Sequence, residues 1–170
     1  LPGDWVVIAN RSLPTQEHDD LDLTVIGNNL IFVLEDKHWG PSIKVTPGAW
    51  IVKNHSRQNP TDRVSFLARK LAGLLRNKVS GYPKRGRLVK SHVVLSYPSV
   101  QVDWSEAGPE SDMVLLLAQA AEALRAEDAT AGPDLQDARE STIAYLDGRK
   151  GRREVPTEIG AYRLVQEIAP

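Results

Sequence analysis

Four charged residues at the ends of two neighbouring apolar runs have the types and spacing needed for chemistry on a phosphodiester. Asp20 and Asp22 lie at the start of the run 21–26, and Glu35 and Lys37 lie at the end of the run that begins at residue 30. Hard divalent ions such as Mg²⁺ are held by one or two carboxylates, with water and phosphate oxygens completing the shell. A lysine two residues from a carboxylate shares its strand face, where it can orient or activate an attacking water. The pattern predicts metal-dependent hydrolysis.

The two runs are expected to form a β-hairpin around Gly27-Asn28-Asn29, because Gly and Asn tolerate the positive φ of tight turns. With Asn28 and Asn29 at the centre of the turn, Asp22 lies opposite Glu35 and Asp20 lies opposite Lys37. Opposed side chains are about 5 Å apart, and like charges at that distance destabilise a sheet unless something positive lies between them. A shift of register would instead oppose Glu35 to Asp20, and the face would remain acidic with one lysine.

A second interpretation of these four residues is a solvated face of an edge hairpin with cross-strand ion pairs. Asp22 opposite Glu35 is a poor pair for that purpose, because two carboxylates repel. We therefore favour a metal site over a solvated face.

The rest of the pattern indicates an α/β fold with a mixed sheet flanked by helices. Asn59 is a suitable N-cap and Pro60 a suitable first residue for an amphipathic helix over 60–78. Its apolar stripe consists of Val64, Leu67, Ala68, Leu71, Leu74 and Leu75. Further strands are expected at 5–9, 43–45, 50–53, 89–95 and 162–168, and further helices at 111–125 and 135–146.

The net charge of −1 results from opposite regional charges. Residues 51–100 contain 11 Lys or Arg and 1 acidic residue, whereas residues 101–150 contain 4 and 11. This asymmetry favours a segment that binds a nucleic-acid backbone, although a solvated helix face and loop would show the same charges. The candidate phosphate-binding residues are Arg63, Arg69, Lys70, Arg76, Lys84, Arg85 and Arg87.

Several classes of function are disfavoured by what the sequence lacks. It contains no cysteine, which removes disulfides and thiolate metal sites. The four histidines have no ligand-like spacing, and we see no Ser-His-Asp arrangement, phosphate-cradling glycine loop or dinucleotide-binding pattern. No apolar run approaches the length of a membrane span. We expect a cytoplasmic domain cut from a longer protein, since the chain begins with Leu1 and shows no signal peptide.

Asp22 and the later Glu35-Asp36-Lys37 match the D…ExK pattern of the restriction-endonuclease-like nucleases. More closely, residues 20–40 resemble the core of the NERD (nuclease-related) family: an acidic strand, a glycine turn, an apolar strand ending in E-x-K, then an aromatic residue and a glycine. Trp50 and the Asn59-Pro60 helix start also fit, so the resemblance covers about residues 5–97. It implies a restriction-endonuclease-like fold that hydrolyses DNA with Mg²⁺ or Mn²⁺. Asp22 and Glu35, with Asp20 nearby, would be metal ligands, and Lys37 the catalytic lysine.

Three departures from the family pattern leave an alternative open. The family's acidic residue on a helix before the first strand has no counterpart here, Arg63 stands where the family often has glutamine, and Asp36 replaces an apolar residue inside E-x-K. The alternative is a catalytically silent module that senses nucleic acid and regulates a serine/threonine kinase.

The C-terminal part suggests how the chain is organised. Residues 1–146 are expected to form the NERD-like domain and residues 147–158 a linker. Residues 159–170 are similar to the first strand of a serine/threonine kinase, before its glycine-rich loop. This second resemblance implies a fusion of the PglW type, found in the phage-growth-limitation and BREX defence systems. The expected partners are DNA, a kinase domain in cis and other phage-defence proteins.

Overall fold

The computed structural model describes residues 2–14, 19–148, 158–159 and 162–163. Its centre is a five-stranded mixed sheet in the order β1-β2-β3-β7-β9. The first three strands are antiparallel neighbours, and β7 and β9 extend the sheet in parallel with β3. These strands are β1 (Val6–Ser12), β2 (Asp20–Ile26), β3 (Ile31–Lys37), β7 (Val89–Leu95) and β9 (Val114–Leu116). The α/β fold expected from the sequence is confirmed.

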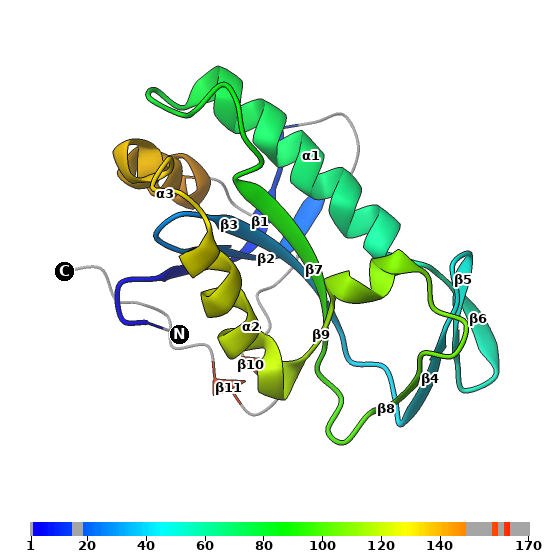
Figure 1. Cartoon of the computed structure of the whole chain (residues 1–170). Coiled ribbons are helices and arrows are strands. Elements are labelled where there is room, and N and C mark those ends of the chain that lie inside the picture. The colour runs from blue at the N-terminus through cyan, green and yellow to red at the C-terminus, as the bar shows by residue number, and fades with distance from the viewer. Residues whose placement is uncertain (1, 15–18, 149–157, 160–161, 164–170) are drawn as a thin grey trace.

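A smaller four-stranded sheet lies to the side of the central sheet, at the right in Figure 1. The hairpin expected around Pro47-Gly48 is present as its two central strands. Its outer strands were not predicted from the sequence, because their residues are mostly polar and exposed. In sheet order the strands are β6 (His55–Gln58), β5 (Ala49–Val52), β4 (Ser42–Val45) and β8 (Gln101–Asp103).

Helix α1 (Pro60–Lys78) begins as predicted. The Asn59 side chain accepts a hydrogen bond of 3.0 Å from the backbone N–H of Thr61 and satisfies one of the free donors of the first turn. Asn59 is itself buried. Leu67, Leu71 and Leu75 lie on the predicted apolar stripe and are almost completely buried. Burial of this stripe fixes which side of α1 faces the sheet.

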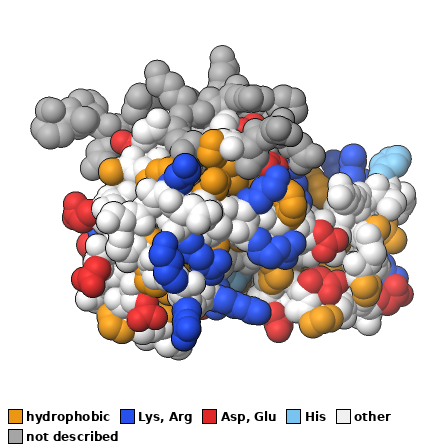
Figure 2. Space-filling model, turned by 90° about the horizontal axis from the view of Figure 1, so that it is seen from above, with side chains coloured by type: hydrophobic (Ala, Val, Ile, Leu, Met, Phe, Trp, Pro, Cys, Tyr) orange, Lys and Arg blue, Asp and Glu red, His pale blue; other side chains and the backbone are white. Residues whose placement is uncertain are grey.

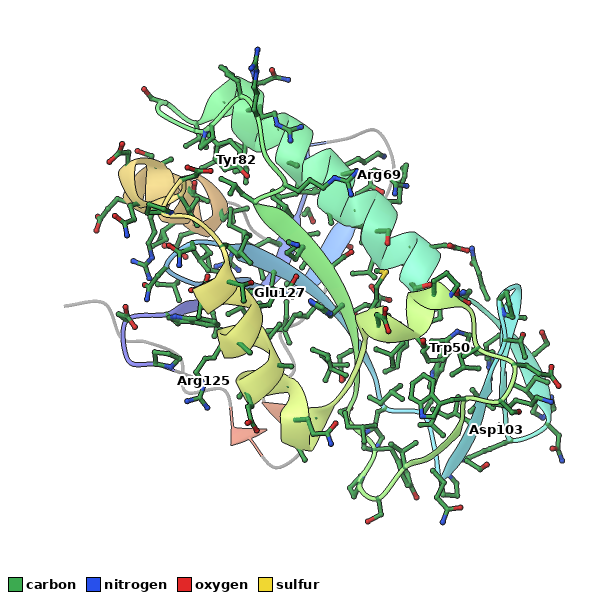
Figure 3. All side chains as sticks on the ribbon, viewed as in Figure 1. Trp50, Arg69, Tyr82, Asp103, Arg125 and Glu127 are labelled. Atoms are coloured by element: carbon green, nitrogen blue, oxygen red, sulfur yellow. The ribbon has the colours of Figure 1, made fainter. Side chains whose placement is uncertain are left out.

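The helices cover both faces of the central sheet (Figure 1). Helix α1 covers the face that carries Glu35, since Arg63 of α1 contacts that residue. Phe32, an odd number of residues from Glu35, points to the opposite face, where its ring lies 6.1 Å from that of His92. His92 in turn contacts Glu127 of α2 (Leu117–Thr130), which extends toward β7 in Figure 3. Helix α3 (Arg139–Asp147) packs near β1, where Arg11 donates to the carbonyl of Leu146.

The prediction of one helix over 111–125 is wrong in its first part. Residues Pro109–Met113 form a short 3₁₀ turn, Val114–Leu116 form β9, and α2 begins only at Leu117. The apolar triplet Val114–Leu116 pairs in parallel with Val93–Leu95 and completes the edge of the sheet. Such long-range pairing overrides local helix propensity. The helix expected at 135–146 is present as a 3₁₀ turn, Gln136–Ala138, followed by α3.

The central hairpin has the predicted register, with Leu23 opposite Leu34 and Ile26 opposite Ile31. Gly27, Asn28 and Asn29 do not take the positive φ that their residue types suggested. Instead the buried carboxylate of Asp128, from α2, accepts hydrogen bonds from the backbone N–H groups of Asn28, Asn29 and Leu30, at 3.2, 2.9 and 2.8 Å. A Cβ at Gly27 would lie 2.5 Å from this carboxylate. Gly27 therefore allows the Asp128 carboxylate to approach the backbone of the turn closely.

The C-terminal predictions fall mainly outside the described residues. Residues 149–157 of the expected linker and most of the kinase-like segment 159–170 lie there. Of the strand expected at 162–168, the structure describes β11 (Tyr162–Arg163), which pairs with β10 (Glu158–Ile159). The domain boundaries stay predictions. No helix within the described residues combines the length and the apolar character of a membrane span.

The turn contacts of Asp128 lead to a stability prediction. We expect Asp128→Ala to lower the free energy of unfolding by about 2–3 kcal/mol, because three backbone donors lose a charged acceptor in a buried setting. Urea unfolding followed by circular dichroism measures the change. The matched control is Asp134→Ala, at an exposed position in the turn after α2, which should leave stability nearly unchanged. Equal stabilities for the two variants would contradict the role assigned to Asp128.

Candidate active site

Glu35 is a carboxylate buried at the end of the central strand. Four apolar residues, Ile31 to Leu34, precede it on β3 and are buried on both faces of the sheet, as expected for a strand with neighbours on either side. Glu35 lies opposite Val93 in the parallel ladder and is 4% exposed. A buried carboxylate is costly unless charge or hydrogen bonds compensate it. The surroundings of Glu35 are therefore expected to be cationic.

Two cations meet this carboxylate on the face of the sheet covered by α1. Lys37, two residues further along β3, places its Nζ 2.5 Å from Oε1 of Glu35. Arg63, in the first turn of α1, places its Nε 3.7 Å from Oε2. The predicted neighbourhood of Glu35 and Lys37 is thus present, and the structure adds Arg63 to it. A cation at each oxygen balances the buried charge.

The two aspartates of β2 lie at the same end of the sheet but have different environments. Asp20 is buried, and its Oδ1 accepts a hydrogen bond of 2.5 Å from the hydroxyl of Ser12, its partner on β1. Asp22 is half-buried. It is two residues from Asp20, so strand alternation puts both on one face. The β2–β3 pairing ends at Leu23 and Leu34, one residue before Asp22 and Glu35 would be opposed. The ladder therefore stops short of the predicted Asp22–Glu35 pair, and the juxtaposition of these two carboxylates stays a prediction.

The carboxylates at this end of the sheet are the ones that would hold the divalent ion implied by the sequence. Across the part of the chain that the structure describes, no three His, Asp or Glu side chains gather into a metal-binding group. Asp20, Asp22 and Glu35 therefore do not form a complete protein-supplied cage. Carboxylate oxygens are nevertheless the donor type that Mg²⁺ and Mn²⁺ prefer, and one or two suffice when water and phosphate supply the rest. The donor chemistry of Asp22 and Glu35 fits such an ion.

The sequence did not predict a second acidic residue that pairs with α1. Asp19 is buried, and its Oδ2 lies 2.5 Å from Nζ of Lys70. Lys70 follows Arg63 by seven residues, so two helical turns bring both cations to one side of α1. This spacing is visible in the sequence, whereas the partners of the two cations are defined only by the packing of α1 on the sheet.

Trp39 has a packing contact with Trp50 and also contacts Lys37. Nζ of Lys37 lies 5.6 Å from the centre of the Trp39 ring. That ring packs edge-on against Trp50 at 6.0 Å, and Trp50 is completely buried in the small sheet. A cation over an aromatic face gains about 0.5–1 kcal/mol at an exposed site. Lys37 is therefore held between the Glu35 carboxylate and an anchored indole.

The predicted phosphate-binding residues separate into three groups in the structure. Arg63 and Lys70 face carboxylates near the end of the sheet, Glu35 and Asp19 respectively. Arg76 and Lys84 hold the loop after α1, since Arg76 donates to the carbonyl of Gly86 and Lys84 donates to the carbonyl of Arg76. The exposed remainder consists of Arg69, Arg85 and Arg87. Lys and Arg side chains gather on the molecular face viewed from above in Figure 2, and Figure 3 labels Arg69 on α1.

The opposite face of the same strand end carries Asp36, Ser96 and His38. The Ser96 hydroxyl lies 3.3 Å from Nδ1 of His38 and also hydrogen-bonds Asp36. Ser96 is almost completely buried between the two, so it is not presented as a nucleophile. Burial raises the pKa of the Asp36 carboxyl above its usual value, and the Ser96 hydrogen bond and the His38 charge only partly oppose this. Ionised Asp36 therefore costs stability.

The raised pKa of Asp36 predicts how stability depends on pH. Between the unfolded and folded pKa values the folded protein binds more protons, so its stability falls as pH rises through that window. Asp36→Asn should therefore raise the free energy of unfolding at about pH 7, and raise it less at about pH 4. Urea unfolding at both pH values measures this. Asp103→Asn is a control that should change stability in the opposite direction, because hydrogen bonds from Ser105 lower the pKa of Asp103 and so favour its ionised form. An equal gain for Asp36→Asn at both pH values would contradict the prediction.

One of the comparisons with known proteins identifies a family for this chain. The family model described as nuclease-related domain, NERD, matches residues 1–96, which is more than half of the chain. The match includes Glu35, Lys37, Arg63 and every strand of the central sheet except β9. No curated protein and no solved structure shows a significant match. The chain belongs to the NERD family of nuclease-related domains.

Proposed function

We propose that this domain hydrolyses phosphodiester bonds of DNA with Mg²⁺ or Mn²⁺ at Asp22 and Glu35. The observation that carries the proposal is the buried Glu35 carboxylate with Lys37 Nζ 2.5 Å away, at a sheet end within a nuclease-related domain. A buried carboxylate paired with a lysine adds little to stability once desolvation is counted, and paired titratable groups of this kind are typical of functional sites.

The side chains have separate roles in the proposed reaction. When bound, the divalent ion would supply Lewis-acid polarisation of the phosphate and lower the pKa of water. Glu35 and Asp22 would provide its carboxylate ligands, with Asp20 supporting the same face. Lys37, held against Trp39, would orient the attacking water and stabilise the negative charge that develops on the phosphate oxygens. The exposed arginines 69, 85 and 87 would hold the nucleic-acid backbone without reading its sequence.

The wider setting belongs to the same proposal. The similarity of residues 159–168 to a kinase strand supports a parent protein in which a serine/threonine kinase follows this domain in cis. A cytoplasmic role in bacterial phage defence, with other defence proteins as partners, follows from that similarity.

A second candidate function is a catalytically silent module that senses nucleic acid and regulates the kinase. The observation that favours it is the double cation contact of Glu35, which leaves each carboxylate oxygen facing a protein cation. Such a site would bind nucleic acid and bind no divalent ion. Calorimetric titration with Mn²⁺ separates the two functions: a signal that Asp22→Ala abolishes favours the nuclease.

The test of hydrolysis is cleavage of plasmid and duplex DNA with Mg²⁺ by the full-length protein. We expect Lys37→Ala to lower the rate by about 10²–10⁴-fold, the usual contribution of a positioned proton-transfer or charge-stabilising group. Lys53→Ala, at an exposed lysine in the β5–β6 turn, is the matched control and should retain the wild-type rate. Circular dichroism and thermal unfolding show whether Lys37→Ala is folded. Equal cleavage by wild type and Lys37→Ala, or no cleavage by either, would refute hydrolysis at this site.

Backbone binding by the arginines makes a separate prediction about salt. The logarithm of DNA affinity falls with the logarithm of salt concentration by about 0.9 per phosphate contact. Replacing Arg69, Arg85 and Arg87 together by Gln should therefore reduce the slope by up to about 3 and weaken binding to all sequences alike. Arg125→Gln, at an exposed position on α2, is the control. Fluorescence anisotropy at several salt concentrations gives the slopes, and an unchanged slope in the triple variant would rule these arginines out as phosphate contacts.

A further inference from the structure

The two cations at Glu35 differ in how firmly they are held. Lys37 is 2.5 Å from the carboxylate, and its side chain is 21% exposed. Arg63 is 3.7 Å away, and its side chain is 45% exposed. Only the Arg63 side of this contact is exposed, and there solvent screens the charge and holding a long side chain costs entropy. Arg63 is thus the partner that Glu35 can exchange.

The charges around Glu35 show what such an exchange would do. Glu35, Lys37 and Arg63 together have a net charge of +1, and Asp20 and Asp22 on the same face bring the total to −1. With Arg63 displaced, the four remaining residues have a net charge of −2. The more negative group attracts a divalent cation more strongly. Arg63 and the ion therefore compete for the same carboxylate.

The position of Arg63 also indicates where its guanidinium goes when it leaves Glu35. Arg63 is exposed in the first turn of α1, and Arg69 follows on the exposed side of the same helix. Because Arg63 is exposed there, a phosphate of a nucleic acid bound over the start of α1 would be within its reach. The planar guanidinium has five donors and binds phosphate with two parallel hydrogen bonds, which a single ammonium group cannot do.

We propose that Arg63 is a displaceable counter-charge of Glu35 that moves to a backbone phosphate when DNA binds, so that DNA and the divalent ion bind with positive coupling. The inference rests on the proposed metal site, but it does not require that the site cleave DNA. Without nucleic acid, Arg63 neutralises Glu35 and weakens the binding of the ion. With nucleic acid, the phosphate takes Arg63 and the carboxylate becomes available. By linkage, the ion strengthens DNA binding by the same factor.

The first experiment measures Mn²⁺ affinity by calorimetry on the full chain without nucleic acid. Arg63→Gln should bind Mn²⁺ on the order of tenfold more tightly than wild type, the effect of one unit charge about 5 Å from a divalent ion in a water-like dielectric. Lys78→Gln removes one positive charge from the exposed last turn of the same helix and should change the affinity less than about twofold. Arg63→Lys keeps the charge and should remain close to wild type. Glu35→Gln should abolish binding in every background.

The second experiment adds a 12-base-pair duplex, with all proteins in a Lys37→Met background so that the duplex stays intact. The parent should bind Mn²⁺ several-fold more tightly with the duplex than without it, and Arg63→Gln should show a smaller gain. Unchanged Mn²⁺ affinity in Arg63→Gln, a parent affinity that does not respond to the duplex, or no Mn²⁺ binding by any protein would each overturn the proposal. If DNA and Mn²⁺ bind with coupling but the protein that retains Lys37 does not cleave DNA, only the proposed hydrolysis is refuted. If the protein cleaves DNA but Arg63→Gln does not change Mn²⁺ affinity, only the role of Arg63 as a counter-charge is refuted.

Discussion

Strand β3 pairs in parallel with β7, and the other features of the site depend on this pairing. Parallel neighbours cannot be joined by a tight turn, so the chain must cross the sheet between them. It does so through the small sheet and α1, which returns over the face that carries Glu35. The crossover therefore places the first turn of α1, with Arg63, above the end of β3. It also leaves Glu35 in the middle of the sheet, where burial makes an uncompensated charge costly.

Charge compensation explains why the acidic and basic parts of the chain come together. Two of the acidic residues at this end of the sheet pair with a side chain of α1: Glu35 with Arg63, and Asp19 with Lys70. Buried carboxylates require such partners, so the basic charge of α1 has a structural role before it has any role with nucleic acid. The same contacts allow regulation, because a compensating cation that is partly exposed can be exchanged for another.

The opposite face of the sheet maintains the geometry of the hairpin. Asp128 from α2 accepts three backbone hydrogen bonds at the turn, and Glu127 beside it contacts His92 on β7. The contacts of Asp128 hold the β2–β3 turn from outside the turn itself. The register in turn determines which side chains share the face of Glu35, so a contact far from the proposed chemistry helps to position it.

The sequence by itself determined the local elements and the candidate residues. The hairpin register followed from the turn and the apolar alternation, the start of α1 followed from Asn59 and Pro60, and Glu35 and Lys37 followed from their spacing on one strand. These features depend on neighbours in the chain, so their physical causes are visible in the sequence. Only the tertiary structure decided that Val114–Leu116 would be a strand and not the start of a helix, that Arg63 would meet Glu35, and that Asp128 would hold the turn. Each of these depends on burial and charge partners brought from distant parts of the chain, and local propensity carries no information about them.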